Sequence, residues 1–112
     1  MIERGQEAED AALDYLRNQG LSEITRNYRC RFGEIDLIMR DDETVVFVEV
    51  RKRSSPRFGG AAESIDTRKK KKLLAAARHY IAAEGAIPDC RFDAVLLNGD
   101  NCIEWVRDAF GE

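Results

Sequence analysis

Residues 33–52 read GEIDLIMRDDETVVFVEVRK, and this stretch predicts two β-strands joined by a short polar turn. The strands are expected over residues 34–40 and 44–51, with Asp41, Asp42 and Glu43 in the turn. The second strand is apolar at every position from Val45 to Val48, so both of its faces are expected to be buried. A strand of this kind is typical of the centre of a sheet.

The segments on either side of this hairpin predict the rest of the fold. Helices are expected over residues 3–18 and 65–84, because apolar side chains recur there every three or four residues. A short strand or irregular segment is expected over residues 24–30, and further strands over residues 91–97 and 102–106. The order α-β-β-β-α-β-β over residues 1–112 predicts a single three-layer α/β/α domain with a central mixed β-sheet.

The composition fits one globular domain without a membrane segment. Of the 112 residues, 44% are hydrophobic and 35% are charged, which supplies one core and excludes a disordered chain. No apolar run could span a bilayer, and residues 1–5 lack the features of a secretory signal. The three cysteines form no Cys-x-x-Cys pair, and Cys90 and Cys102 are expected to be buried in strands. A cytoplasmic protein is therefore expected.

The charges are unevenly distributed along the chain. The net charge is −3, which argues against an obligate non-specific nucleic-acid binder. Basic residues nevertheless cluster at residues 51–53, at Arg57 and at residues 68–72. Such a local basic stripe can meet a phosphate backbone, especially where a divalent cation offsets nearby carboxylates.

Two acidic residues of the hairpin are expected to face each other. If Arg40 pairs with Val45, the same register places Asp36 directly opposite Glu49. Like charges at opposed positions of a sheet are destabilising, and a divalent cation removes the repulsion. Carboxylate oxygens are ligands that Mg²⁺ prefers, so the pair predicts a site for Mg²⁺ or Mn²⁺.

A second interpretation of the same residues stays open. The register also places Glu34 opposite Arg51, and the charged side chains of both strands fit a solvated ladder of ion pairs. Ion pairs of that kind contribute little to stability.

Several motifs together resemble a known family. They are GEIDLI at residues 33–38, FVEVR at 47–51 and RFD at 91–93, with Gly5, Glu9, Leu16, Lys69 and residues 109–110. On these residues the chain resembles the YraN family of uncharacterised bacterial proteins, which is grouped with the restriction-endonuclease-like nucleases. The active-site pattern of those nucleases is an Asp, followed later by an acidic residue, one spacer and a lysine.

The resemblance implies a restriction-endonuclease-like fold and a metal-dependent nuclease that acts on DNA or a structured nucleic acid. Asp36 would be the first ligand of Mg²⁺ or Mn²⁺ and Glu49 the second, with Val50 as the spacer. Arg51 stands where the pattern has lysine. An arginine can clamp a phosphate through two donors, but its permanent charge excludes a role as a base.

Other candidate residues complete this hypothesis. Glu9 would be a helical acid that approaches the metal, or else an acid favourable to its own helix dipole. Arg53, Arg57 and Lys69 would guide a nucleic-acid backbone, whereas a solvated helix face is the alternative for Arg68, Lys71 and Lys72. His79 is expected at the boundary of the core. Two rival functions remain, namely a nucleic-acid-binding module without turnover and a protein–protein adaptor.

Overall fold

The computed structural model describes residues 4–52, 66–85, 89–98 and 102–110. Its elements follow the predicted order and are α1 (Arg4–Asn18), β1 (Ser22–Cys30), β2 (Gly33–Asp41), β3 (Thr44–Lys52), α3 (Thr67–Glu84), β4 (Cys90–Leu97) and β5 (Ile103–Phe110).

The five strands form one mixed sheet in the order β1-β2-β3-β4-β5. The pairs β1–β2, β2–β3 and β4–β5 are antiparallel, whereas β3 and β4 are parallel. The parallel pair requires a crossover connection, and α3 lies within it. The strand predicted as central, β3, has a neighbour on each side and is buried from Val45 to Glu49.

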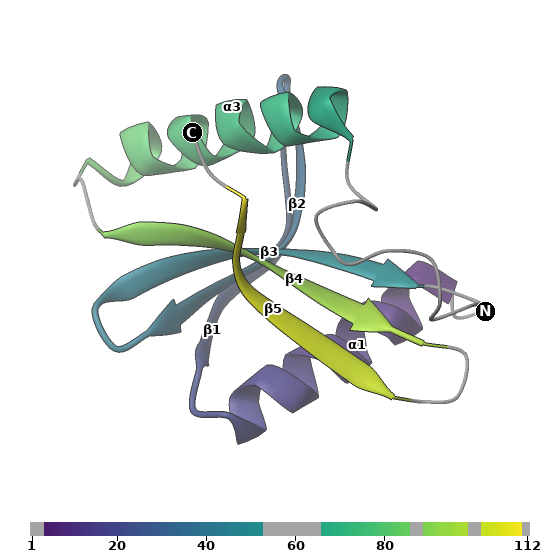
Figure 1. Cartoon of the computed structure of the whole chain (residues 1–112). Helices are drawn as coiled ribbons and strands as arrows, with labels where there is room; N and C mark the ends of the chain where they lie inside the picture. Colours follow the sequence, from purple (N-terminus) through teal and green to yellow (C-terminus); the bar gives the residue numbers. More distant parts are fainter. Residues whose placement is uncertain (1–3, 53–65, 86–88, 99–101, 111–112) are drawn as a thin grey trace.

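One helix covers each face of the sheet (Figure 1). On one face, Leu73, Ala76, Ala77 and Tyr80 of α3 pack in one cluster with Phe47 of β3. On the other face, the buried side chains of α1 are Ala12, Leu13 and Leu16, and they pack with residues such as Val46 and Val48. The predicted three-layer α/β/α architecture is therefore confirmed, and it is consistent with a restriction-endonuclease-like fold. None of the helices in the described ranges has an apolar stretch long enough to cross a membrane.

Each end of α3 has a capping residue, Asp66 at the start and Gly85 at the end. The carboxylate of Asp66 accepts a hydrogen bond from the Lys69 N–H at 2.8 Å, as a helix N-cap residue does. Gly85 ends the helix in the left-handed conformation, with φ of 77°. The Asp66 cap fixes where α3 begins above the sheet, and therefore where the basic residues of its first turns lie.

The expected burial of two cysteines is wrong. Cys90 and Cys102 are both exposed and free. Cys90 is the first residue of β4, and Cys102 precedes the first residue of β5, so neither lies in the covered middle of a strand. β5 also continues to Phe110, four residues beyond its expected end at residue 106.

Candidate functional site

The hairpin that contains Asp36 and Glu49 has the expected register, but its ladder ends early. Pairing runs from Asp41 and Thr44 to Leu37 and Val48, which includes the expected pair of Arg40 and Val45. Beyond this point the backbone N–H of Val50 donates to Oδ2 of Asp36 at 2.8 Å. The Asp36 side chain thus replaces a ladder hydrogen bond at the place where the two strands separate.

A local distortion of β1 and β2 explains this position of Asp36. Ile35 and Ile38 pack in the same cluster, although residues three apart in a regular strand point to opposite faces. At the corresponding position of β1, Asn27 has a positive φ of 55°. Such a conformation is uncommon outside glycine and is found at functional sites. The alternation of side chains therefore changes at Asp36, and its carboxylate turns toward β3.

The two carboxylates form a buried and mutually repulsive pair. Glu49 is only 3% exposed. The pKa of Asp36 is raised to about 7, first by burial and then by the charge of Glu49 and a hydrogen bond between the two carboxyl groups. Among the described residues, no donor reaches Oε1 of Glu49, which is fully buried. A buried carboxylate oxygen without a donor is stabilised by a bound proton or by a cation, so the two carboxylates are suited to hold either of these.

Lys69 of α3 supplies a positive charge to this pair. Its Nζ lies 3.2 Å from Oε2 of Glu49, while 40% of the Lys69 side chain remains exposed. The N-cap bond from Lys69 N–H to Asp66 positions the first turn of α3, from which the side chain extends to β3. This contact offsets one carboxylate charge and leaves the other Glu49 oxygen unpaired.

Glu9 of α1 approaches the same region. Burial raises the pKa of Glu9, and the charge of Asp36 raises it further, while a hydrogen bond from Asn27 and the charge of Arg26 lower it. Arg26 lies 3.7 Å from Glu9. Within the described ranges, no three His, Cys, Asp or Glu side chains converge closely enough to hold a metal ion by themselves. Glu9 therefore contributes negative charge near Asp36 without joining Asp36 and Glu49 as a third close ligand.

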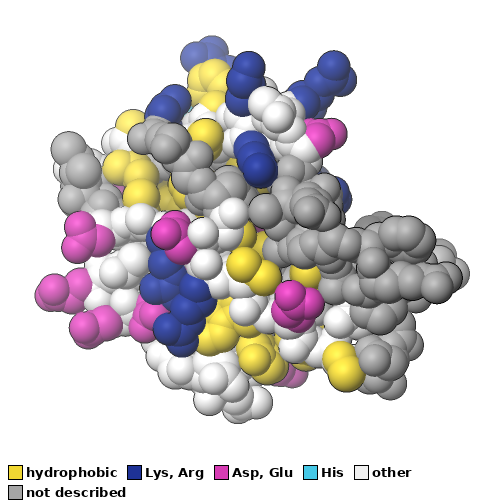
Figure 2. Space-filling view, viewed as in Figure 1, with side chains coloured by type: hydrophobic (Ala, Val, Ile, Leu, Met, Phe, Trp, Pro, Cys, Tyr) yellow, Lys and Arg dark blue, Asp and Glu magenta, His cyan; other side chains and the backbone are white. Residues whose placement is uncertain are grey.

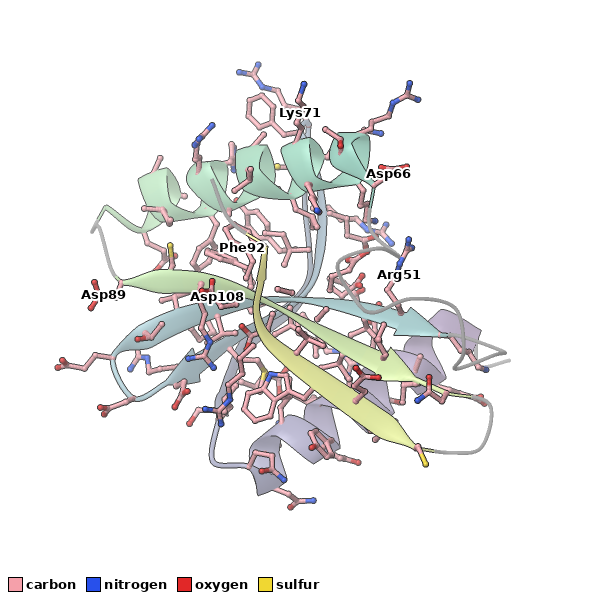
Figure 3. The ribbon with its side chains drawn as sticks, in the orientation of Figure 1. Arg51, Asp66, Lys71, Asp89, Phe92 and Asp108 are labelled. Atoms are coloured by element: carbon pink, nitrogen blue, oxygen red, sulfur yellow. The ribbon has the colours of Figure 1, made fainter. Side chains whose placement is uncertain are left out.

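The remaining candidate residues have different positions. Arg51 is half-buried at the end of β3, and its side chain extends on the α3 side of the sheet toward the end of the helix where Asp66 lies (Figure 3). The expected pairing of Glu34 with Arg51 is wrong, because the ladder between β2 and β3 has ended by this point. Glu34 instead pairs with Arg29 of β1 at 2.8 Å. Arg53 and Arg57 lie outside the described residues.

A second buried acid shows what a purely structural carboxylate looks like in this protein. Asp93 is fully buried and accepts hydrogen bonds from Arg91 Nε at 3.0 Å, Trp105 Nε1 at 2.9 Å and the Asp108 N–H at 2.9 Å. Both Asp93 oxygens therefore have donors, which is the usual condition of a buried acid. Glu49 is similarly enclosed, but the described residues give it no such set of donors.

The sequence hypothesis missed two residues that position the site. Asn27 distorts β1 opposite Asp36, and Asp66 places Lys69 over β3. Asp is among the residue types preferred at a helix N-cap, so the sequence does contain a signal for Asp66. Asn is among the residue types most tolerant of a positive φ after glycine, but that tolerance alone does not locate a distortion.

Comparison with known protein sequences identifies the family. The profile of the uncharacterised protein family UPF0102 matches residues 8–97, which include Asp36, Glu49 and Lys69. The chain belongs to the UPF0102 family. The resemblance to the YraN family is thereby confirmed.

UPF0102 relatives are similar over nearly the whole length. A UPF0102 protein of Nitrosomonas europaea is 60% identical over 112 residues, which cover 97% of this chain and 94% of the relative. A UPF0102 protein of Cupriavidus taiwanensis is 56% identical over 108 residues, which cover 96% of this chain and 82% of the relative. One from Methylobacillus flagellatus is 54% identical and covers 98% of each chain.

Proposed function

We propose that this UPF0102 protein is a nuclease-like protein that binds nucleic acid, DNA foremost, through a divalent cation held by Asp36 and Glu49. The observation that carries the proposal is the fully buried Glu49 Oε1, which has no donor among the described residues and lies beside a second carboxylate. Two carboxylates completed by water and phosphate oxygens are a common ligand set for Mg²⁺. When bound there, Mg²⁺ or Mn²⁺ would polarise a phosphoryl oxygen and acidify a water molecule.

The charges around the pair support a cation-dependent affinity for phosphate. The carboxylates of Asp36 and Glu49 act on each other and Glu9 adds its charge near Asp36, while Lys69 contacts Glu49 and Arg26 lies near Glu9. A divalent cation adds two positive charges at the pair and makes it more attractive to a phosphate. Arg51 then offers two donors to a phosphate, and the exposed part of Lys69 offers a further cation.

Hydrolysis, where it occurs, follows the usual balance for a phosphodiester. The oxygen of a water molecule forms a new P–O bond, one bridging P–O bond breaks, and the proton that the water loses is balanced by the one that the leaving oxygen takes up. Asp36 and Glu49 would hold the cation, and Lys69 contacts the other oxygen of Glu49. Arg51 stabilises charge on the phosphate but does not accept the proton of the attacking water, since its guanidinium stays protonated.

The second candidate is a binding module of the same fold that does not turn over. The arginine at position 51 favours it, because the nuclease pattern has a lysine there. Both candidates require the cation and nucleic acid, and they differ only in cleavage. A protein–protein adaptor requires neither.

The test compares wild-type protein with Arg51→Lys, using labelled DNA and RNA at low salt. Binding is measured with Ca²⁺ and cleavage with Mn²⁺, and Asp36→Asn serves as the matched control at the metal pair. Cation-dependent binding that Asp36→Asn abolishes supports the proposal, and Mn²⁺-dependent cleavage that rises in Arg51→Lys identifies a nuclease. Binding without cleavage by either form identifies the binding module. Absence of binding to DNA and RNA by both forms contradicts the proposal and leaves the adaptor.

A further inference from the structure

The tip of the β1–β2 hairpin is held against α3. Figure 1 shows this hairpin rising behind the helix. At the tip, Gly33 approaches α3 so closely that a Cβ on it would lie 3.3 Å from the Cβ of Lys72, and its φ of 154° further favours glycine. Close packing of backbone on helix fixes the tip, and with it the two preceding side chains, Arg31 and Phe32.

Phe32 presents an aromatic ring to solvent at this tip. It is 40% exposed and is the large hydrophobic side chain that stands out as exposed in the described part of the chain. Its ring lies 5.9 Å from that of His79 at an interplanar angle of 60°. His79 Nδ1 in turn lies 2.6 Å from the hydroxyl of Tyr28, whose ring packs edge-on against Tyr80 of the core. The ring is thus supported from below by a chain of aromatic contacts.

Positive charge surrounds this ring. The guanidinium of Arg31 lies 4.9 Å from the centre of the Phe32 ring. Arg31, Arg68, Lys71 and Lys72 are exposed, and no carboxylate of the described residues forms an ion pair with them. Figure 2 shows Lys and Arg side chains gathered at the top of the molecule, over α3, with hydrophobic side chains among them. Figure 3 shows Lys71 on the outer side of the helix.

The acidic groups near the tip do not cancel this charge. Glu34, beside Gly33, is paired with Arg29 at 2.8 Å. Among the described residues, Glu84 at the end of α3 also acts on this region, where its charge raises the pKa of Tyr28 and of Tyr80. A positively charged surface with an exposed, rigid aromatic ring is complementary to a nucleobase and its flanking phosphates.

We propose that Phe32 stacks against an unpaired base of the bound nucleic acid, while Arg31 and Lys72 contact phosphates on either side of it. A base within a duplex has both faces covered by its neighbours, so the preferred ligand is a single-stranded segment or a strand with an unpaired base. The guanidinium of Arg31 lies over one face of the Phe32 ring and adds a flat cationic surface there, so the base stacks on the other face or takes the place of the guanidinium. This inference rests on the proposed function, because it names the form of nucleic acid that the same protein binds.

The geometry joins this surface to the carboxylate pair. Asp36 follows Phe32 by four residues along the chain, a path of about 13 Å at the usual rise of a strand. In α3, Lys69 contacts Glu49 and His79 contacts Phe32. Lys69 and His79 are about 15 Å apart along the helix axis at the usual rise of a helix. Both paths correspond to about four nucleotides at the spacing of about 3.4 Å in a duplex, and to fewer in a more extended single strand. A strand stacked on Phe32 therefore reaches the pair with a phosphate a few nucleotides away.

The test measures fluorescence anisotropy of a labelled single-stranded oligodeoxynucleotide and of a blunt duplex of equal length, in low salt with Ca²⁺. Phe32→Ala is expected to weaken binding of the single strand about 5- to 100-fold, the usual loss for one stacked base. Phe32→Trp is expected to keep wild-type affinity, and duplex binding is expected to change less than about twofold in Phe32→Ala because no stacked base is lost. Phe32→Ala leaves the salt dependence unchanged, whereas Lys72→Gln lowers the slope of log affinity against log salt by about 0.7.

Two results overturn the inference while the proposed function stands. One is unchanged single-strand affinity in Phe32→Ala, and the other is an equal loss for single strand and duplex. If the alanine variant melts at a lower temperature, Phe32→Leu replaces it, because leucine keeps an apolar contact with His79 but has no aromatic face. If the wild-type protein binds neither the single strand nor the duplex, the proposed function is contradicted, and this inference with it.

Discussion

Replacement of Asp36 by Asn is expected to stabilise the metal-free protein above neutral pH. The pKa of Asp36 is raised from 3.8 to about 7 in the folded protein, chiefly by burial and by the charge of Glu49. Between these two pKa values the folded state binds more protons than the unfolded state, so stability falls as pH rises from about 4 to about 7. Asn carries no charge and can still accept the hydrogen bond from Val50 N–H.

The size of the effect follows from the shift. About three pKa units correspond to about 4 kcal/mol, so the variant is expected to gain up to that amount at about pH 8 and almost nothing at about pH 4. For a domain of this size, the gain raises the melting temperature by up to roughly 15 °C. The side-chain amide that the substitution introduces also offers a donor to the unpaired oxygen of Glu49.

Thermal unfolding in chelator at about pH 4 and about pH 8 measures this effect. Asp93→Asn is the matched control, because Asp93 is a buried carboxylate with donors on both oxygens. Loss of a paired buried charge is expected to destabilise that variant by about 3–5 kcal/mol. A lower melting temperature for Asp36→Asn than for wild type at the higher pH would refute the description of Asp36 and Glu49 as a repulsive pair and favour a structural ion-pair ladder.

Two further outcomes concern the basic residues and the helix that carries Lys69. Arg51→Ala is expected to weaken binding of DNA in Ca²⁺ and to reduce the slope of log affinity against log salt by about one, which is the amount for one phosphate contact. An unchanged slope in a salt titration would exclude that contact. Asp66→Ala removes the N-cap of α3 and is expected to lower the free energy of unfolding by about 1 kcal/mol in urea denaturation, whereas an unchanged midpoint would mean that the hydrogen bond to Lys69 N–H does not stabilise the helix.

The sequence predicted the two paired strands of the central hairpin, and offered their register as one possibility, because two local signals agreed. The polar turn at residues 41–43 and the apolar run after it allowed Arg40 to pair with Val45, and the structure has this pair. The order of the elements followed from periodicity, and β3 is central because it is apolar on both faces. These features depend on neighbours in the sequence and on the burial of one strand.

The details of the candidate site depend on contacts between distant segments, which periodicity does not contain. The ladder between β2 and β3 ends before Asp36, at the position where Asn27 of another strand has a positive φ. Lys69 reaches Glu49 only because α3 crosses above the end of β3, an arrangement that requires the whole packed sheet. The prediction that Glu34 pairs with Arg51 was wrong for the same reason, because it required β2 to continue as a regular strand through Asp36.

Binding of Mn²⁺ tests the central claim most directly. Isothermal titration calorimetry of the wild-type protein, at a pH above the raised pKa of Asp36, is expected to show one site for Mn²⁺, formed by Asp36 and Glu49. Asp36→Asn and Glu49→Gln are each expected to abolish this site, and Asp93→Asn is expected to retain it wherever it remains folded. Equal Mn²⁺ binding by wild type, Asp36→Asn and Glu49→Gln, or no binding by any of them, would contradict the account.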